Sequence, residues 1–331
     1  MSDLIPSFSD ALLRRDPFFR TMQAEQTDCY RLFHGAVEGC PGLSIDRYGN
    51  HLLFQTWREA VTAEQIEALH ALACTALQCE LTSVWNDRSK RGAVQHETHP
   101  ISETPTSGVE LGLRYDVRLR HEGIDPLLFL DFRAGRRWMR RQALDKDVLN
   151  LFAYTCGIGV AALAGGAKQV LNVDFAARSL EIGRRNAQYN QLDVQRFKTL
   201  KENVIPVIRQ FAGLGIRGRA ARRKYTRLSP RLFDIVVLDP PRLSKSPFGK
   251  VDLVSDYASL FKPALLCTRP GGKLIFTNNV ASVEESAWHE RLEKSAKKAG
   301  RPLQTLIPLR PEEDFPSFDQ RWPLKMAILH V

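Results

Sequence analysis

Residues 147–166 read DVLNLFAYTCGIGVAALAGG, and this stretch decides how the rest of the chain is interpreted. Residues 147–154 form a mostly apolar run, which is typical of a buried parallel strand. Gly157 and Gly159 follow, and the apolar residues behind them end at two consecutive glycines, as helices often do. The pattern predicts a strand, a tight turn and a helix, and the small residues of the turn would let the backbone approach a ligand.

Three more apolar runs occur farther along the chain, at residues 168–174, 233–239 and 271–279. Residues 178–192, between the first two of these runs, have the periodicity of an amphipathic helix. Apolar runs that alternate with helices are expected for parallel strands that are covered on both faces. We therefore predict an α/β fold in which residues 124–331 form a doubly wound, Rossmann-like domain.

The residues that precede this domain predict a smaller unit. Residues 51–57 predict a strand, and Thr62 to Gln65 resemble a capping box at the start of a helix. The apolar residues behind that box recur at helical spacing. We predict a small α/β subdomain at residues 31–123, preceded by a helical arm at residues 1–30.

The composition limits the classes of protein to consider. With 331 residues, 44% of them hydrophobic, the chain can bury a full core. It has neither a membrane-length apolar run nor a secretory signal pattern, so we expect a cytoplasmic protein without a membrane partner. The six cysteines form no C-x-x-C pair and have no histidine at ligand spacing, so we expect no metal site. The net charge of +10 favours a polyanionic partner.

Residues 209–231 carry an unusual concentration of positive charge. Eight of these residues are basic and none is acidic. A connection of this length exceeds the roughly 12 to 15 residues that are usual within compact domains. Two interpretations stay open: a solvated loop and a contact with nucleic acid.

Two acids follow predicted elements at positions where a cofactor could bind. Asp174 ends the second predicted strand and could accept hydrogen bonds from the ribose hydroxyls of an adenosine-containing cofactor, or it could cap the next helix. Glu202 could accept a hydrogen bond from an adenine amino group, or it could be a surface acid. The pattern from Gly157 through Ala162 also satisfies the dinucleotide fingerprint, so these residues alone permit a nicotinamide enzyme.

Asp239-Pro240-Pro241 has no counterpart in the dinucleotide fingerprint. Two prolines fix an extended backbone and remove two amide donors, so that carbonyl groups and the aspartate line the end of the strand. This motif favours a different adenosine cofactor over a nicotinamide dinucleotide.

From Arg31 to the C-terminus, the chain resembles the large-subunit ribosomal RNA methyltransferases that act on cytosine carbon 5 or guanine N7. The matching motifs, in order, are Arg31-Leu32-Phe33-His34-Gly35, Gly42-Leu43-Ser44-Ile45-Asp46-Arg47-Tyr48-Gly49, Phe129-Leu130-Asp131-Phe132-Arg133 with Arg136-Arg137, Asn150-Leu151-Phe152-Ala153-Tyr154-Thr155, Asp174, Asn186, Asp239-Pro240-Pro241 and Pro323-Leu324-Lys325. The resemblance implies S-adenosylmethionine as cofactor and RNA, ribosomal in particular, as substrate. It also implies that the small subdomain binds RNA.

The resemblance also assigns roles to individual residues. The expected cofactor contacts are Tyr154, Thr155, Gly157, Gly159, Asp174, Glu202 and Asp239, and Asp131 and Arg133 would border the same site. The expected catalytic residues, at the ends of the third and fourth predicted strands, are Asp239, Pro240, Asn278 and Asn279.

Three departures from the family pattern bear on the substrate. The chain begins without room for the PUA domain that usually precedes the cytosine-modifying members, and residues 209–231 resemble an insertion. Residues 277–279 are Thr-Asn-Asn, where the cytosine-modifying members have a Ser-Cys-Ser-like sequence. Methylation of cytosine carbon 5 requires a thiolate that attacks carbon 6. A guanine nitrogen needs no such activation, and Ser-Asn-Asn is typical of the guanine-modifying members.

These residues slightly favour a guanine ring nitrogen as the target. Exocyclic amino groups are less favoured, because Arg242 follows the two prolines where an aromatic residue would stack on the base. Cytosine carbon 5 is the first alternative. The second is a catalytically weak RNA-binding protein that keeps the methyltransferase fold.

Overall fold

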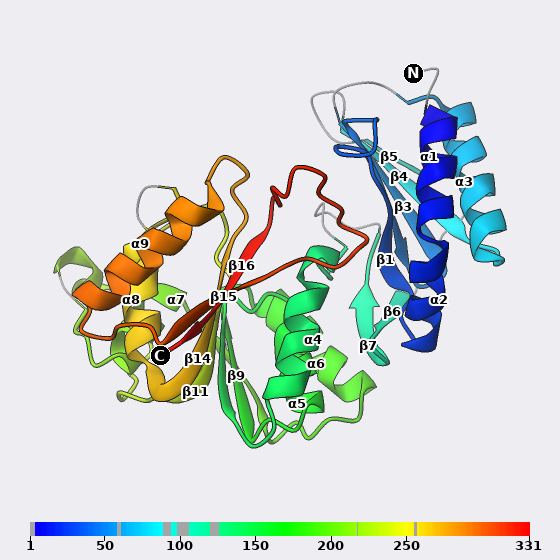
Figure 1. Cartoon of the computed structure of the whole chain (residues 1–331). Helices are drawn as coiled ribbons and strands as arrows, with labels where there is room; N and C mark the ends of the chain where they lie inside the picture. Colours follow the sequence, from blue (N-terminus) through cyan, green and yellow to red (C-terminus); the bar gives the residue numbers. More distant parts are fainter. Residues whose placement is uncertain are drawn as a thin grey trace. The chain divides into compact units, whose positions relative to one another are not determined.

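The chain folds into two compact units (Figure 1). This computed structural model describes residues 4–57, 61–88, 94–97, 106–119, 126–216, 218–254 and 257–331. Unit 1 comprises Met1–Arg133 and Pro311–Gln320, and unit 2 comprises Ala134–Arg310 and Arg321–Val331. No helix of the described residues is both long and apolar enough to cross a membrane.

Unit 1 is built on a mixed five-stranded sheet with the order β1-β2-β3-β4-β5. Its elements are α1 (Leu4–Arg14), α2 (Asp16–Ala24), β1 (Cys29–His34), β2 (Leu43–Tyr48), β3 (His51–Thr56), α3 (Ala63–Leu77), β4 (Thr82–Asp87), β5 (Val94–Glu97), the hairpin β6 (Thr106–Glu110) and β7 (Leu113–Val117), and the short η1 (Leu130–Phe132). The strands pair antiparallel except β3 and β4, which α3 connects in parallel. The predicted capping box at Thr62 is confirmed.

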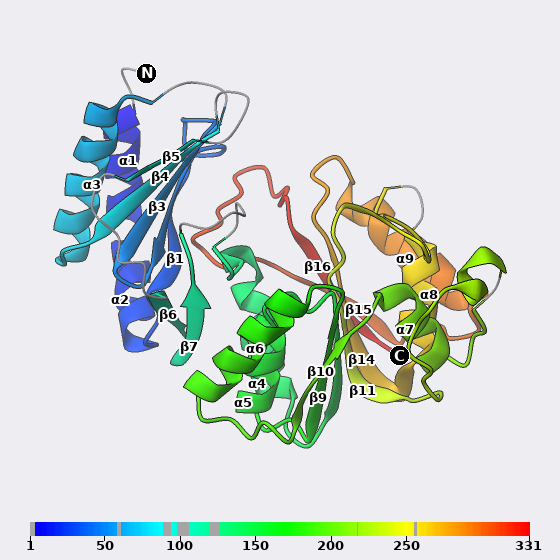
Figure 2. The ribbon, with the colours of Figure 1, turned by 180° about the vertical axis from the view of Figure 1, so that it is seen from behind.

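One face of this sheet packs against helices (Figure 2). Phe8 of α1 and Ile66 of α3 share an apolar cluster with Leu32, Ile45 and Phe54 of the strands. These strand residues alternate with polar ones, as expected for a sheet whose two faces have different surroundings. The opposite face of the sheet is mixed, because Arg31 and Asp46 lie in one row with the buried Leu53 and Val84.

A buried ion cluster holds the segment Pro311–Gln320 in unit 1. Arg133 is fully buried and donates hydrogen bonds to Glu312 (2.7 Å), to Asp314 (2.5 Å) and to the carbonyl oxygen of Cys29 (3.0 Å). Asp314 is also fully buried, and it accepts a second bond from the backbone amide of Arg31 (3.0 Å). Neither charge of the Arg133–Asp314 pair can therefore be stabilised by water.

Unit 2 contains a seven-stranded sheet with the order β10-β9-β8-β11-β14-β16-β15. Its elements are α4 (Arg133–Gln142), β8 (Asp147–Leu151), α5 (Gly157–Ala164), β9 (Gln169–Asp174), α6 (Ala177–Tyr189), β10 (Phe197–Lys201), α7 (Val204–Phe211), η2 (Gly218–Arg222), β11 (Phe233–Leu238), the hairpin β12 (Leu243–Ser246) and β13 (Gly249–Asp252), α8 (Ala258–Leu266), β14 (Thr268–Asn278), α9 (Glu285–Lys298), β15 (Thr305–Leu309) and β16 (Lys325–His330).

The strand directions and the helices confirm the predicted doubly wound architecture. Strands β10, β9, β8, β11 and β14 run parallel, and β16 is antiparallel to both of its neighbours. Figure 1 shows α4, α5 and α6 on one face of the sheet and α7, α8 and α9 on the other. The strand order reverses between β8 and β11, which is where open α/β sheets bind their ligands.

The division of the chain differs from the expected one in three respects. The expected arm at residues 1–30 is part of unit 1, because its helices pack in the same apolar cluster as the sheet. The first unit ends at Arg133 instead of residue 123, and Pro311–Gln320 belongs to it as well. The charge network of Arg133 is the physical reason for both of these differences.

Candidate cofactor and active site

The turn after β8 has a strained backbone at the point where the strand order reverses. Three residues that are not glycine have positive φ there: Phe152 (57°), Tyr154 (48°) and Cys156 (60°). Such a conformation is sparsely populated, so it persists only where the surroundings fix it, and it is often found at ligand sites. The amide of Ala153 donates to the carbonyl of Val173 (3.0 Å), which ties the turn to β9.

Asp174 ends β9 and holds this turn in place. Its Oδ2 accepts a hydrogen bond from the amide of Tyr154 (2.9 Å), and its Oδ1 accepts one from the amide of Ala176 (2.8 Å) at the start of α6. Burial raises the pKa of this carboxyl. Each carboxylate oxygen can accept a further bond. Asp174 is not the N-cap of α6, because that position is Ala176 and no side chain caps it. The carboxylate keeps capacity for ribose hydroxyls.

Glu202 lies beside Asp174, at the end of the neighbouring strand β10. Its amide donates to the carbonyl of Asp174 (3.0 Å). Its carboxylate accepts hydrogen bonds from the amides of Asn203 (2.9 Å) and Thr226 (2.8 Å). The two acids expected to bind adenosine thus follow adjacent strands, and both are oriented by backbone donors.

Asp239 ends β11, and the adjacent end of β14 fixes its side chain. The hydroxyl of Thr277 donates a hydrogen bond to Asp239. The strand register places Leu238 opposite Phe276. Asp239 and Thr277 are the next residues on the two strands, so their side chains lie close together. Sequence reasoning gave Thr277 no role, because a contact between two strand ends becomes visible only once the sheet is formed.

Asn278 does not point to open space as the expected catalytic role requires. It is fully buried, its Oδ1 accepts a hydrogen bond from the amide of Val280 (3.0 Å), and its Nδ2 donates to the carbonyl of Leu253 (3.4 Å). Its side chain is thus held by backbone groups, and its catalytic role stays a prediction. Asn279, the next residue, is exposed.

Lys325 is a buried residue of this region to which sequence reasoning gave no role. It lies opposite Asn278 in the β14–β16 register, is 3% exposed, and donates to the carbonyl of Val280 (2.8 Å). Burial lowers the pKa of its ammonium group. Lys325 and Asn278 together fix the loop that follows β14.

Gly159 is explained by packing. A Cβ atom at this position would lie 2.1 Å from Oδ1 of Asn172 on β9, so a side chain would push α5 away from the sheet. This helix–strand contact explains the glycine, and the approach of a ligand to Gly159 stays a prediction. Its neighbours in the expected cofactor set, Thr155 and Gly157, belong to the turn and to the first position of α5.

Asp131 and Arg133 lie in unit 1, and Asp131 lines a pocket of that unit. All three guanidinium nitrogens of Arg133 are bonded within unit 1. The contact of either residue with the cofactor stays a prediction. Among the described residues, no group of three or more His, Cys, Asp or Glu side chains could hold a metal ion.

Comparisons with known proteins agree with this fold. A family model described as S-adenosylmethionine-dependent methyltransferase matches residues 30–330. Ribosomal RNA large subunit methyltransferase I of Aeromonas hydrophila is 30% identical over 293 residues, which is 87% of this chain and 70% of that protein. The protein of the same name from Escherichia coli K12 is 27% identical over 303 residues, or 89% of this chain and 72% of that protein.

Solved structures give the same fold. An S-adenosylmethionine-dependent methyltransferase from Streptococcus mutans has a TM-score of 0.78 at 25% identity, over 99% of this chain and 80% of that structure. A methyltransferase solved in complex with SAH has a TM-score of 0.80 at 24% identity, over 99% of this chain and 82% of that structure.

The sheet order, the strained turn and the acids at the strand ends define a Rossmann-like class I methyltransferase. Because the family model matches nearly the whole chain, the protein belongs to the S-adenosylmethionine-dependent methyltransferase family. It is therefore an enzyme, its cofactor is S-adenosylmethionine, and the nicotinamide alternative is excluded.

The slight preference for a guanine nitrogen is not supported. The preference rested on residues 277–279, which lack the cysteine needed for cytosine and resemble the Ser-Asn-Asn of guanine-modifying members. Since Asn278 is buried and bonded to backbone groups, its presence says little about the base.

Proposed function

We propose that this enzyme methylates RNA of the large ribosomal subunit. The observation that carries the proposal is the similarity to ribosomal RNA large subunit methyltransferase I, which extends over 87% of the chain and includes both units. The net charge of +10 supports a polyanionic substrate.

The residues at the strand ends suit the proposed reaction. S-adenosylmethionine supplies a methyl group on a sulfonium. Asp174 would bind the ribose hydroxyls, Glu202 the adenine amino group, and the turn from Tyr154 to Gly157 the rest of the cofactor. Asp239 and Pro240, with Asn279 beyond β14, would position the target base. Positioning of this kind can lower a barrier by roughly 7 to 11 kcal/mol.

Nucleoside analysis tests this function directly. Large-subunit ribosomal RNA from cells that lack the protein should miss one methylated nucleoside, and purified enzyme with S-adenosylmethionine should restore it. A control enzyme with Asp239→Asn should restore much less. Identical methylation of the RNA with and without the protein would contradict the proposal.

Cytosine carbon 5 is the target that we propose, because the relatives fit it best. This chemistry requires a thiolate. Cys267 is poorly suited, since it is fully buried and burial raises its pKa to about 12. Its carbonyl oxygen accepts a hydrogen bond from the amide of Phe233 at the start of β11. Cys267 therefore lies at the amino ends of the strands, whereas Asp239 lies at their carboxyl ends. Cys156 lies at the carboxyl ends of the strands, as Asp239 does, but it is also fully buried, and burial raises its pKa.

We therefore expect Cys267→Ser to keep turnover within a few-fold of the wild type, because loss of a true nucleophile typically removes several orders of magnitude. RNA that contains 5-fluorocytidine should trap the enzyme in a covalent adduct if the target is cytosine. Serine replacement of each of the six cysteines in turn would identify the thiol. An adduct that depends on Cys267 would contradict the argument from burial.

The basic segment 209–231 is partly fixed to unit 2. Gln210 of α7 donates to the carbonyl of Thr226 (3.0 Å) and accepts from the amide of Leu228 (3.0 Å). Arg222, Arg223 and Lys224, by contrast, are exposed. This arrangement supports a surface that presents charge to RNA phosphates.

We expect simultaneous replacement of Arg222, Arg223 and Lys224 by alanine to weaken RNA binding and to reduce its salt dependence. For every ion pair with a phosphate that the substitutions remove, the slope of log affinity against log salt should fall by about 0.7 to 0.9. Titrations at several salt concentrations measure this slope, while calorimetry with S-adenosylmethionine should show unchanged cofactor affinity. Wild-type affinity and slope in the triple variant would mean that the segment is only solvated.

A further inference from the structure

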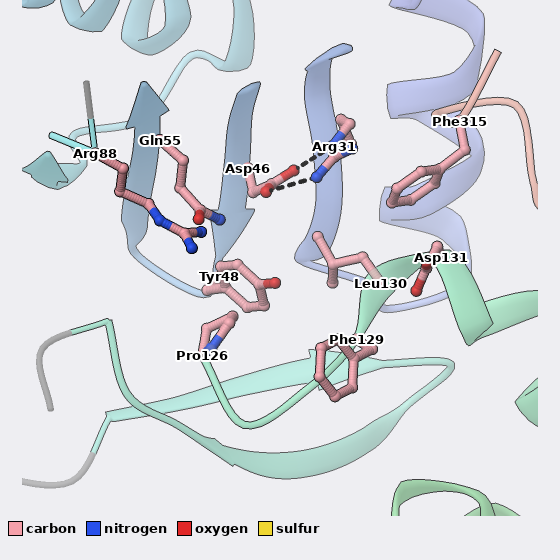
Figure 3. Close-up of a pocket in the computed structure, with 10 residues that line it drawn as sticks. All are labelled: Arg31, Asp46, Tyr48, Gln55, Arg88, Pro126, Phe129, Leu130, Asp131 and Phe315. Atoms are coloured by element: carbon pink, nitrogen blue, oxygen red, sulfur yellow. Dashed lines mark hydrogen bonds and ion pairs between the residues drawn. The ribbon is translucent and has the colours of Figure 1, made fainter. Parts of the chain in front are cut away.

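The pocket that Asp131 lines lies in unit 1, on the face of the five-stranded sheet opposite the helices (Figure 3). Its volume is about 290 Å³, near the lower limit of ligand pockets. Arg31, Asp46 and Gln55 extend into it from β1, β2 and β3, and Phe129 closes it from the segment before η1. A volume of this size suits one planar ring system with its attached groups.

The charges in the pocket wall largely cancel. Arg31 and Asp46 form a two-bond ion pair (2.7 and 3.1 Å), and the guanidinium of Arg31 also lies 4.5 Å from the ring centre of Phe315. Arg88 and Asp131 are the other charged residues of the wall. With two positive and two negative groups, the wall favours a neutral, polar ligand over a highly charged one.

Polar groups on this face are available to a ligand. The side-chain amide of Gln55 and the guanidinium of Arg88 form no hydrogen bond or ion pair within the part of the chain that the structure describes. The guanidinium of Arg88 lies over the ring of Trp57, 5.8 Å from its centre. In the strand register, Gln55 lies between Ser44 and Asn86, on the same face. Both of these neighbours are at least 97% buried, and Oγ of Ser44 and Oδ1 of Asn86 have no partner among the described residues.

The aromatic lining supplies a surface for stacking. Phe129 is 50% exposed although it is a large apolar residue, and Tyr48 and Pro126 lie near it in the wall. The hydroxyl of Tyr48 donates to the carbonyl of Leu128 (3.1 Å), which holds the segment containing Phe129 against the sheet. An exposed ring beside an amide and a guanidinium that can donate hydrogen bonds is the combination that proteins use for unpaired bases.

We infer that this pocket binds one unpaired nucleotide of the RNA substrate, with its base stacked on Phe129 and its polar edge hydrogen-bonded by Gln55 and Arg88. The inference rests on the proposed function, since it takes the substrate to be RNA. The pocket belongs entirely to unit 1, whereas the cofactor residues Asp174 and Asp239 belong to unit 2.

Binding of short oligoribonucleotides to the full chain tests the inference. Fluorescence anisotropy would measure the affinity of labelled five-nucleotide strands of A, C or U and of a labelled duplex. Phe129→Ala and Gln55→Ala should each weaken binding of the preferred single strand at least about five-fold, as expected when a base loses its stacking partner or edge contact. The matched controls in the same unit are Phe318→Ala (70% exposed) and the exposed Gln23→Ala, which should stay within two-fold.

The outcomes separate this inference from the proposed function. Pocket variants that bind like the controls would overturn the inference, as would a wild-type chain that binds no single strand or binds the duplex equally well. Methylation of ribosomal RNA by the wild type is measured in parallel. If single strands bind through Phe129 and Gln55 but no methyl group is transferred, the pocket stands and the proposed function fails.

Discussion

Replacement of Arg133 by methionine should lower the free energy of unfolding by about 3 to 5 kcal/mol. The fully buried Arg133 is the ion-pair partner of both Glu312 and Asp314, and Asp314 is fully buried as well. Removing the guanidinium leaves a carboxylate without a counter-ion in a site that water does not reach. Such an uncompensated charge costs far more than the loss of an exposed pair.

Urea denaturation followed by circular dichroism would measure this effect. Arg20→Met is the matched control, because Arg20 pairs with Asp16 while 72% of its side chain is exposed, and its loss should cost less than about 1 kcal/mol. Adding Asp314→Asn to Arg133→Met should recover part of the stability, since it removes the buried charge. If Arg133→Met and Arg20→Met are equally stable, the ion cluster does not hold the segment in place.

Asp174→Ala should weaken binding of S-adenosylmethionine about ten-fold or more. Charge-assisted hydrogen bonds to two hydroxyls contribute about 1.5 to 3 kcal/mol. The same change removes the acceptor for the amides of Tyr154 and Ala176, so the strained turn loses one of its restraints. Both effects reduce affinity.

Calorimetric titration with S-adenosylmethionine would measure the loss. Asp193→Ala serves as the control, because Asp193 also accepts a backbone hydrogen bond (from Gln195, 2.8 Å) but lies in an exposed turn of unit 2. Its cofactor affinity should match the wild type. Affinity within two-fold of the wild type for Asp174→Ala would refute its assignment to the ribose.

The strands that the sequence predicted correctly can be recognised from a run of consecutive apolar residues. Strands β8, β9 and β11 and the part of β14 from Gly272 onward are mostly apolar, because most residues on both of their faces are buried. Strand β10 lies at the edge of the sheet and was missed, since its sequence FKTLK is half polar and only Phe197 is buried. Apolar patterning reports burial, so an edge strand gives a weak signal.

The side chains of the site were predicted less completely than its backbone. The motifs at the strand ends located Asp174 and Asp239 because parallel strands present their carboxyl ends at one edge. They could not indicate that Asn278 turns inward while Asn279 stays exposed. The pairing of Arg133 with Asp314 could not be predicted for a different reason. The two residues are 181 positions apart, and no local sequence pattern indicates a contact over such a separation.

That separation also has a consequence for biosynthesis. A ribosome adds about 5 to 20 residues each second, so roughly 10 to 40 seconds pass between the synthesis of Arg133 and that of Asp314. During this interval the nascent first unit carries a cationic side chain whose counter-ion does not yet exist. Unit 1, although it contains the N-terminus of this chain, can therefore complete its folding only after nearly all of unit 2 has been translated.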